Sequence, residues 1–193
     1  VNAICNHDLF ACELTDPATD CELGWWDLNG DYDDGCEMSG DGQGDSCAES
    51  VVLQEVSDHG GGGLESASGQ LVPAGDEDWY QITGIDNLVD DEQVSGCDSY
   101  HVEISFTEQP AGVVFDVATD SCTEVGCTVS DFFEFFTDDR DEHGIGECPC
   151  TMTNEPNVNI CNAESHIFYV RVYRVAGYPV SGEQYTIEIT NGI

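Results

Sequence analysis

The amino-acid sequence predicts an all-β protein, an antiparallel β-sandwich of about eight strands that follows a loop-rich N-terminal segment held together by disulfides. From residue 49 onward, short segments of alternating apolar and polar residues are separated by turn residues. Residues 1–48 instead carry five of the 11 cysteines among Asp, Glu and Gly, with little hydrophobic periodicity. We therefore expect a cysteine-rich acidic segment over residues 1–48 and the sandwich over residues 49–193.

The expected strands follow from side-chain alternation. Val102, Ile104 and Phe106 fall on one face of a strand over residues 100–107, and similar alternation marks residues 113–117, 168–173 and 185–190. About four further segments meet the same criteria. In chain order, the expected strands are Val51–Val56, Gln70–Val72, Asp78–Thr83, Tyr100–Thr107, Val113–Val117, Asp131–Phe136, Phe168–Tyr173 and Tyr185–Thr190.

The charge of the chain excludes several classes of partner. There are 40 Asp and Glu residues against 3 arginines and no lysine, which gives a net charge of −37. Such a surface repels phosphate backbones and anionic lipid, so we expect no nucleic-acid partner. No apolar run approaches the ~20 residues of a membrane helix, so we expect no membrane span. The acidity has two readings: metal-cation binding, or adaptation to high salt with no functional role.

The cysteines predict disulfides and an oxidising compartment. They are spread along the chain rather than set in two short-spaced pairs, which favours disulfides over a zinc cluster. The chain begins with Val1 rather than Met, and we expect a mature protein that is secreted or at the cell surface.

The number of cysteines is odd, so one thiol is free or bonded to another chain. We expect the odd cysteine within residues 1–48, with Cys5 as the first candidate for an intermolecular bond; a buried free thiol is the alternative. The cysteines expected to form disulfides are Cys12, Cys21, Cys36, Cys47, Cys97, Cys122, Cys127, Cys148, Cys150 and Cys161.

The N-terminal segment contains a candidate calcium loop. Acids and amides alternate as the first ligands of an EF-hand do, at Asp27, Asn29, Asp31, Asp33 and Asp34. The glycine and the bidentate glutamate of an EF-hand are absent, so we expect another kind of calcium loop, closed by a bond between the two cysteines that flank it at positions 21 and 36. A solvated acidic turn is the alternative.

Two stretches resemble the bacterial pre-peptidase C-terminal (PPC) domain. The first is Gly75-Asp76-Glu77-Asp78-Trp79-Tyr80-Gln81-Ile82; the second is the pair Phe168–Val172 and Tyr185–Ile189. The resemblance covers about residues 49–193, although the cysteines and the long stretch over residues 128–164 depart from the family. It implies a non-catalytic, jelly-roll-like module of the kind that accompanies secreted enzymes and in some members binds calcium or extracellular material. It further implies that Asp76 and Asp78 are calcium ligands; the alternative is that they cap a turn.

The sequence lacks the motifs of an enzyme. There is no Gly-x-Ser-x-Gly, no His-Glu-x-x-His and no phosphate-binding loop, and the five histidines are scattered singly. We expect Arg171 and Arg174 each to anchor carboxylates, within the subunit or across an interface. The first functional hypothesis is a secreted structural protein that self-associates into an extracellular fibre, appendage or surface layer. The alternative is a PPC-like module that binds extracellular polymer or protein, and a secreted hydrolase is a distant third.

Overall fold

The sheets of the computed structural model confirm the predicted β-sandwich. The structure describes residues 3–6, 11–14, 21–28, 35–59, 63–88, 100–123, 125–136, 150–151, 159–160, 163 and 165–192. Its elements are β1 (Ala3–Asn6), β2 (Ala11–Leu14), β3 (Trp25–Trp26), β4 (Met38–Ser39), the 3-10 turn η1 (Cys47–Glu49), β5 (Val51–Val52), β6 (Val56–Ser57), β7 (Gly63–Gly69), β8 (Glu77–Ile85), β9 (His101–Glu108), β10 (Val113–Thr119), β11 (Val125–Ser130), β12 (Phe132–Phe136), β13 (Cys150–Thr151), β14 (Asn159–Ile160), β15 (His166–Arg174) and β16 (Tyr185–Asn191). No helix among these described residues is long and apolar enough to cross a membrane.

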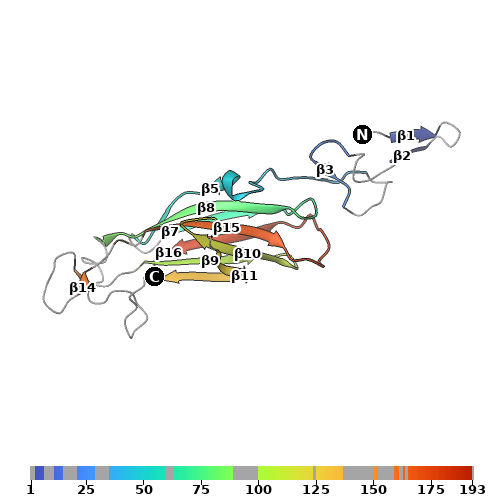
Figure 1. The fold of residues 1–193 in the computed structure, drawn as a ribbon. Coiled ribbons are helices and arrows are strands. Elements are labelled where there is room, and N and C mark those ends of the chain that lie inside the picture. The colour runs from blue at the N-terminus through green and yellow to red at the C-terminus, as the bar shows by residue number, and fades with distance from the viewer. Residues whose placement is uncertain are drawn as a thin grey trace.

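Two sheets form the sandwich. The first has the order β11-β10-β15-β8-β5, with β6 also paired to β8, and the second has the order β12-β9-β16-β7. All of these pairings are antiparallel except those of β5 and β6, which run parallel to β8. In Figure 1 the long strands of both sheets lie together in one stack, and β5 lies beside β8 at its edge.

The core lies between the two sheets, where alternate residues of facing strands meet. Val102 and Ile104 of β9 are fully buried and Phe106 packs against the core, as their alternation predicted. The strand β8 alternates regularly between buried and partly buried positions. Its buried set begins with a carboxylate, Asp78, and continues with Tyr80 and Ile82. One end of the core is therefore closed by an acidic side chain.

Two strand predictions need correction. The strand expected at Gln70–Val72 is absent from those residues, and the edge strand β7 instead covers Gly63–Gly69. Small residues fill much of β7, so it lacks the β-branched and aromatic composition by which strands are recognised. The strand expected at Val51–Val56 is divided into β5 and β6. The sequence analysis did not predict β11.

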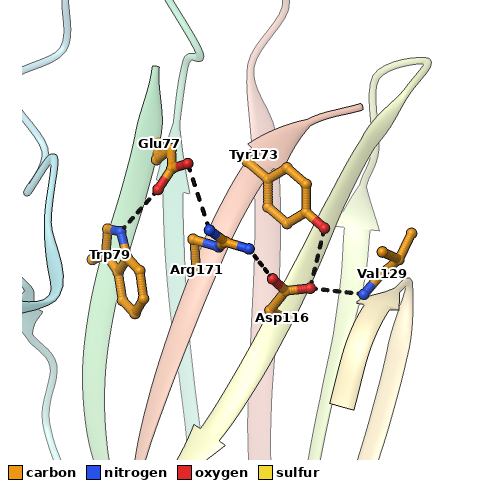
Figure 2. A network of polar contacts seen from close by, with 6 residues as sticks. All are labelled: Glu77, Trp79, Asp116, Val129, Arg171 and Tyr173. Carbon is orange, nitrogen blue, oxygen red and sulfur yellow. Dashed lines mark hydrogen bonds and ion pairs between the residues drawn. The ribbon is translucent and has the colours of Figure 1, made fainter. Parts of the chain in front are cut away.

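The outer face of the first sheet carries a polar network around Arg171 (Figure 2). The Arg171 guanidinium donates to the Asp116 carboxylate and lies 3.6 Å from Glu77. Asp116 also accepts from the Tyr173 hydroxyl at 3.1 Å and from the backbone amide of Val129 at 2.7 Å. This confirms that Arg171 anchors carboxylates within the subunit and ties β8, β15, β10 and β11 together.

Arg174 has a different environment from the one predicted. Its guanidinium donates to the Ala111 carbonyl at 3.0 Å and to the Ser181 hydroxyl at 3.3 Å. The described hydrogen-bond acceptors of Arg174 are therefore neutral, and a carboxylate, Glu183, acts on it through charge and accepts from the same Ser181 hydroxyl. The residue therefore fixes the loops at the end of the sandwich.

Two disulfides lie within the described residues, and one of them joins the two parts of the chain. The bond between Cys21 and Cys36 confirms the pair expected to close the acidic loop. Cys47 bonds to Cys122, across the boundary expected near residue 48. That bond uses one cysteine from each part and leaves four in residues 1–48 and five in residues 49–193. Because the first part now holds an even number of remaining cysteines, counting no longer favours it as the location of the odd cysteine. The backbone register of β1 and β2 also places position 12 opposite Cys5.

We predict that the double variant Cys47→Ala/Cys122→Ala loses more stability than Cys21→Ala/Cys36→Ala. The first bond spans a sequence separation of 75 and the second spans 15. Loop-closure entropy gives losses of about 4 and about 3 kcal/mol in the free energy of unfolding. Urea denaturation of both variants in calcium-containing buffer measures the difference. A smaller loss for the Cys47–Cys122 pair would contradict the view that this bond fastens the N-terminal segment to the sandwich.

A candidate cation site at the end of the sandwich

Three carboxylates from two parts of the chain meet at one end of the sandwich. Asp76 and Asp78 come from the turn before β8 and from its beginning, and Asp41 comes from the N-terminal segment. One carboxylate oxygen from each lies within 4.8 Å of the other two. Asp41 is exposed, Asp76 is half-buried and Asp78 is buried, so the cluster leads from the surface into the core. We call these three residues the Asp41–Asp76–Asp78 cluster.

Asp78 is the buried member of the cluster, and only one of its two carboxylate oxygens has a hydrogen-bond partner among the described residues. The residue is 0% exposed because β8 directs it inward between the sheets. One carboxylate oxygen, Oδ2, accepts from the Tyr185 hydroxyl at 2.5 Å, and that hydroxyl lies 2.7 Å from the hydroxyl of Tyr80. The other oxygen, Oδ1, is buried and has no hydrogen-bond partner among the described residues. A buried carboxylate oxygen without a partner is costly, and a bound cation would satisfy it.

Asp41 is held in place by backbone amides from two segments. Its Oδ1 accepts from the amide of Gln43 at 3.1 Å, and its Oδ2 accepts from the amide of Gln70 at 2.5 Å. The first contact is local, whereas the second joins the N-terminal segment to the residue that follows β7. Nearby, the amide of Trp79 donates to the Gly44 carbonyl at 2.8 Å. The segment around Asp41 is therefore docked along the sandwich by hydrogen bonds from the backbone amides of Gln70 and Trp79.

A glycine leaves the centre of the cluster open. A Cβ atom at Gly69 would lie 2.7 Å from Asp78 Oδ2 and 2.9 Å from Asp41 Oδ2. It would also lie 2.6 Å from the Tyr185 hydroxyl. Real Cβ atoms do not approach other atoms so closely, so a side chain at this position would displace the two carboxylates. Gly69 thus allows the acids of both parts to converge on one point.

Asp76 ends a tight turn and faces the same point. The turn runs from Pro73 to Asp76, closed by the Asp76 amide, which donates to the Pro73 carbonyl at 3.2 Å. Gly75 takes φ 86, the left-handed conformation that favours glycine. The Asp76 carboxylate accepts from the Val72 amide at 2.8 Å, so Asp76 does cap the turn. That contact occupies Oδ2 and leaves Asp76 with further acceptor capacity toward the cluster.

Burial and mutual repulsion keep protons on this cluster. Burial is the main cause that raises the pKa of Asp78; with the negative charges of Asp41, Asp76 and Asp45, and against the opposing hydrogen bond from Tyr185, the pKa reaches about 7. Burial also raises the pKa of Asp76 to about 6, with smaller contributions from Asp41 and Asp45. None of the ion pairs formed by described residues reaches the three acids. The site therefore has a deficit of positive charge.

This arrangement fits a hard divalent cation. Calcium takes six to eight oxygen ligands at about 2.3–2.6 Å, from carboxylates, carbonyls and water. The cluster supplies three carboxylates, one of which has a buried oxygen in need of a partner. A cavity of about 380 Å³ lies beside it, lined by Asp41, Asp45 and Asp76 together with Trp26 and Pro73, and can hold water ligands. The residues present thus match the chemistry of a calcium site.

The two acids that the sequence analysis singled out at the turn do lie together, and a third was missed. Nothing local marks Asp41, because its role depends on how the N-terminal segment docks on β7 and β8. Asp27 is described but does not belong to the cluster. The other expected ligands of the acidic loop, Asn29, Asp31, Asp33 and Asp34, lie outside the described residues, so that loop stays a prediction.

No family model, no curated protein and no solved structure matches the chain.

We predict that stability falls as the pH rises in calcium-free buffer. The folded protein keeps protons on Asp76 and Asp78 up to pH values near their pKa values of about 6 and about 7, whereas the unfolded chain releases them near pH 4. The folded state therefore binds more protons than the unfolded state between these limits, and the free energy of unfolding decreases through this window as the pH increases. We expect a melting temperature at least about 3 °C lower at pH 8 than at pH 5.

The matched variant for this prediction is Asp78→Asn, which keeps the shape and an acceptor for Tyr185 but cannot ionise. Its melting temperature should depend much less on pH than that of the parent protein. Saturating calcium should remove most of the fall in the parent. An equal fall in Asp78→Asn would assign the effect to general surface repulsion instead of the cluster.

Proposed function

We propose that this chain is an extracellular, non-enzymatic structural protein that binds calcium at the Asp41–Asp76–Asp78 cluster and self-associates through the edges of its sheets into a fibre, appendage or surface layer. Two disulfides among the described residues support an oxidising, extracellular setting. Calcium and the Cys47–Cys122 bond would then fasten the N-terminal segment to the sandwich by independent means. The result is a rigid building block.

The observation that carries self-association is the character of the sheet edges. The outermost strands among the described residues are β11 and β5 in the first sheet and β12 and β7 in the second. Each carries one large hydrophobic side chain that faces solvent. These side chains and their exposed fractions are Val129 60%, Val52 70%, Phe132 47% and Leu64 65%.

Exposed strand edges invite pairing with another chain, and proteins usually protect them with lysine, proline or a covering segment. This chain contains no lysine at all. An unpaired edge offers main-chain donors and acceptors, and a hydrophobic residue on it adds apolar burial when a second strand docks. Each of the four edge strands therefore offers a second copy both backbone hydrogen-bonding groups and an exposed hydrophobic side chain.

The net charge sets the conditions for such assembly. At −37, two copies repel one another over about the Debye length, which is about 10 Å in 0.1 M salt and about 3 Å in 1 M salt. Divalent cations that neutralise carboxylates reduce this repulsion further. Assembly should therefore need calcium or high salt.

One observation favours the alternative, a module that binds an extracellular polymer. The rings of Trp79 and Tyr173 flank Arg171 on the outer face of the first sheet (Figure 2), with the guanidinium 5.8 and 4.5 Å from their centroids. Half-exposed rings fixed on a flat sheet can stack against planar or sugar-like ligands. This alternative predicts a monomer that binds polymer, and loss of binding in Trp79→Ala.

We predict that calcium binding depends on the cluster. Titration calorimetry at pH 8 should show a site in the 0.1–1 mM range of extracellular modules. Asp41→Asn and Asp78→Asn should each weaken it by about tenfold or more, equivalent to about 1.4 kcal/mol. Asp131→Asn is the control, because Asp131 is an exposed acid outside the cluster. A similar loss in the control would mean diffuse binding to an acidic surface and would sink the proposed site.

We predict that lysine on the sheet edges prevents assembly. Leu64→Lys and Phe132→Lys each place a charge on an outermost strand, where an incoming strand would bury it. Both should remove ordered polymers seen by negative-stain microscopy in calcium and high salt, and shift sedimentation toward the monomer.

Leu23→Lys and Tyr178→Lys are matched controls for the edge variants. They also replace exposed hydrophobic residues by lysine, but these residues lie outside the strands, at 104% and 51% exposure. They should assemble like the parent. Polymers that persist in both edge variants, or a parent protein that stays monomeric in all conditions, would overturn the assembly proposal.

A further inference from the structure

A second cluster of metal-ligating side chains lies on the opposite sheet, away from the calcium candidate. It consists of His101 and Glu103 on β9 and Glu134 on the neighbouring strand β12. Residues 101 and 103 alternate with the core residues Val102 and Ile104, so they belong to the outer face of the sheet. The β9–β12 register sets Glu134 directly opposite Glu103.

The three donor atoms are already spaced like the ligands of one small cation. His101 Nε2 lies 3.5 Å from Glu103 Oε1 and 3.7 Å from Glu134 Oε2, and all three atoms lie within 4.8 Å of one another. In a tetrahedral zinc site with bonds of about 2.0–2.1 Å, ligand atoms are about 3.3 Å apart. A small rotation of the two glutamates would bring the set to that geometry.

The two glutamates, Glu103 and Glu134, repel each other, and a nearby positive charge would relieve this repulsion. Two like charges directly opposite each other across neighbouring strands destabilise a sheet. The chain has no lysine, and the ion-paired arginine of the described residues, Arg171, lies on the other sheet. Among the described residues, an imidazolium at His101 or a divalent cation between the carboxylates would balance Glu103 and Glu134.

The histidine is the fixed member of the cluster. His101 is 8% exposed, its amide donates to Asn191 Oδ1 at 3.2 Å, and its carbonyl accepts from the Gly192 amide at 3.0 Å. The side chains of Glu103 and Glu134 are 43% and 45% exposed, so they can adjust around an ion. Water would complete a four-coordinate set on that side.

We propose that His101, Glu103 and Glu134 form a second metal site, selective for a borderline divalent transition metal such as zinc and not for calcium. A buried imidazole nitrogen suits zinc, copper or nickel, whereas calcium prefers oxygen ligands alone. The bound ion would tie β12, an outermost strand, to β9. It would therefore stabilise the edge that carries Phe132.

The test is a titration with zinc alone, in buffer with saturating calcium, on protein whose free thiols have been alkylated so that cysteine cannot bind the metal. We expect one site, weakened at least about a hundredfold by His101→Gln and about tenfold by Glu134→Gln. Glu134 is exposed, so its variant tests the site even if the buried histidine is needed for folding. Amide exchange in β12 should slow when zinc binds the parent protein and not the variants.

His166→Gln is the matched control, because His166 also pairs with a carboxylate, Asp120, at 2.7 Å, but in a pair without a second acid among the described ion pairs. Zinc binding should be unchanged in this variant and in Asp78→Asn. Three results would overturn the proposal: unchanged zinc affinity in Glu134→Gln, equal loss in His166→Gln, or displacement of zinc by calcium at similar concentrations. The first two would leave His101 as the ion-pair partner of the two glutamates, and the third would show a cation site without selectivity for zinc.

Discussion

The buried carboxylate of Asp78 is the most costly feature of the described core, and the arrangement of the residues around it has to compensate for that cost. It stands where an apolar residue would otherwise close the end of the core, and its Oδ1 has no hydrogen-bond partner among the described residues. Interior carboxylates are tolerated when other groups compensate them. Here Tyr185 supplies one hydrogen bond, and Asp41 and Asp76 bring two further acids to the same point. That arrangement is unfavourable for a bare protein and favourable for one that holds a cation.

The buried carboxylate lies at the junction between the N-terminal segment and the sandwich. The backbone amides of Gln70 and Trp79 donate to the Asp41 carboxylate and to the Gly44 carbonyl, and the Cys47–Cys122 bond follows a few residues later. A cation at the Asp41–Asp76–Asp78 cluster would neutralise the three carboxylates and so strengthen the same junction. The sequence predicts that the segment builds no core of its own, so we expect its described residues near Asp41 to depend on these contacts with the sandwich.

The sequence predicted the parts of the fold that depend on local pattern. Alternation located β9, β10, β15 and β16, because each buries one face. It failed at Gln70–Val72 because the true edge strand, β7, is rich in glycine and serine. It also found Asp76 and Asp78, through their resemblance to a known turn. Asp41, the Cys47–Cys122 bond and the meeting of Glu103 with Glu134 depend on tertiary docking and strand register, which no local pattern encodes.

The most direct test of the account is amide hydrogen exchange, with and without calcium, at the junction. The amides of Gln70 and Trp79 bond across the seam, to Asp41 and Gly44. If a cation at the cluster clamps the segment onto the sandwich, calcium will slow exchange at these two amides in the parent protein and leave it unchanged in Asp41→Asn. Unchanged exchange in the parent, or equal slowing in the variant, would contradict the account.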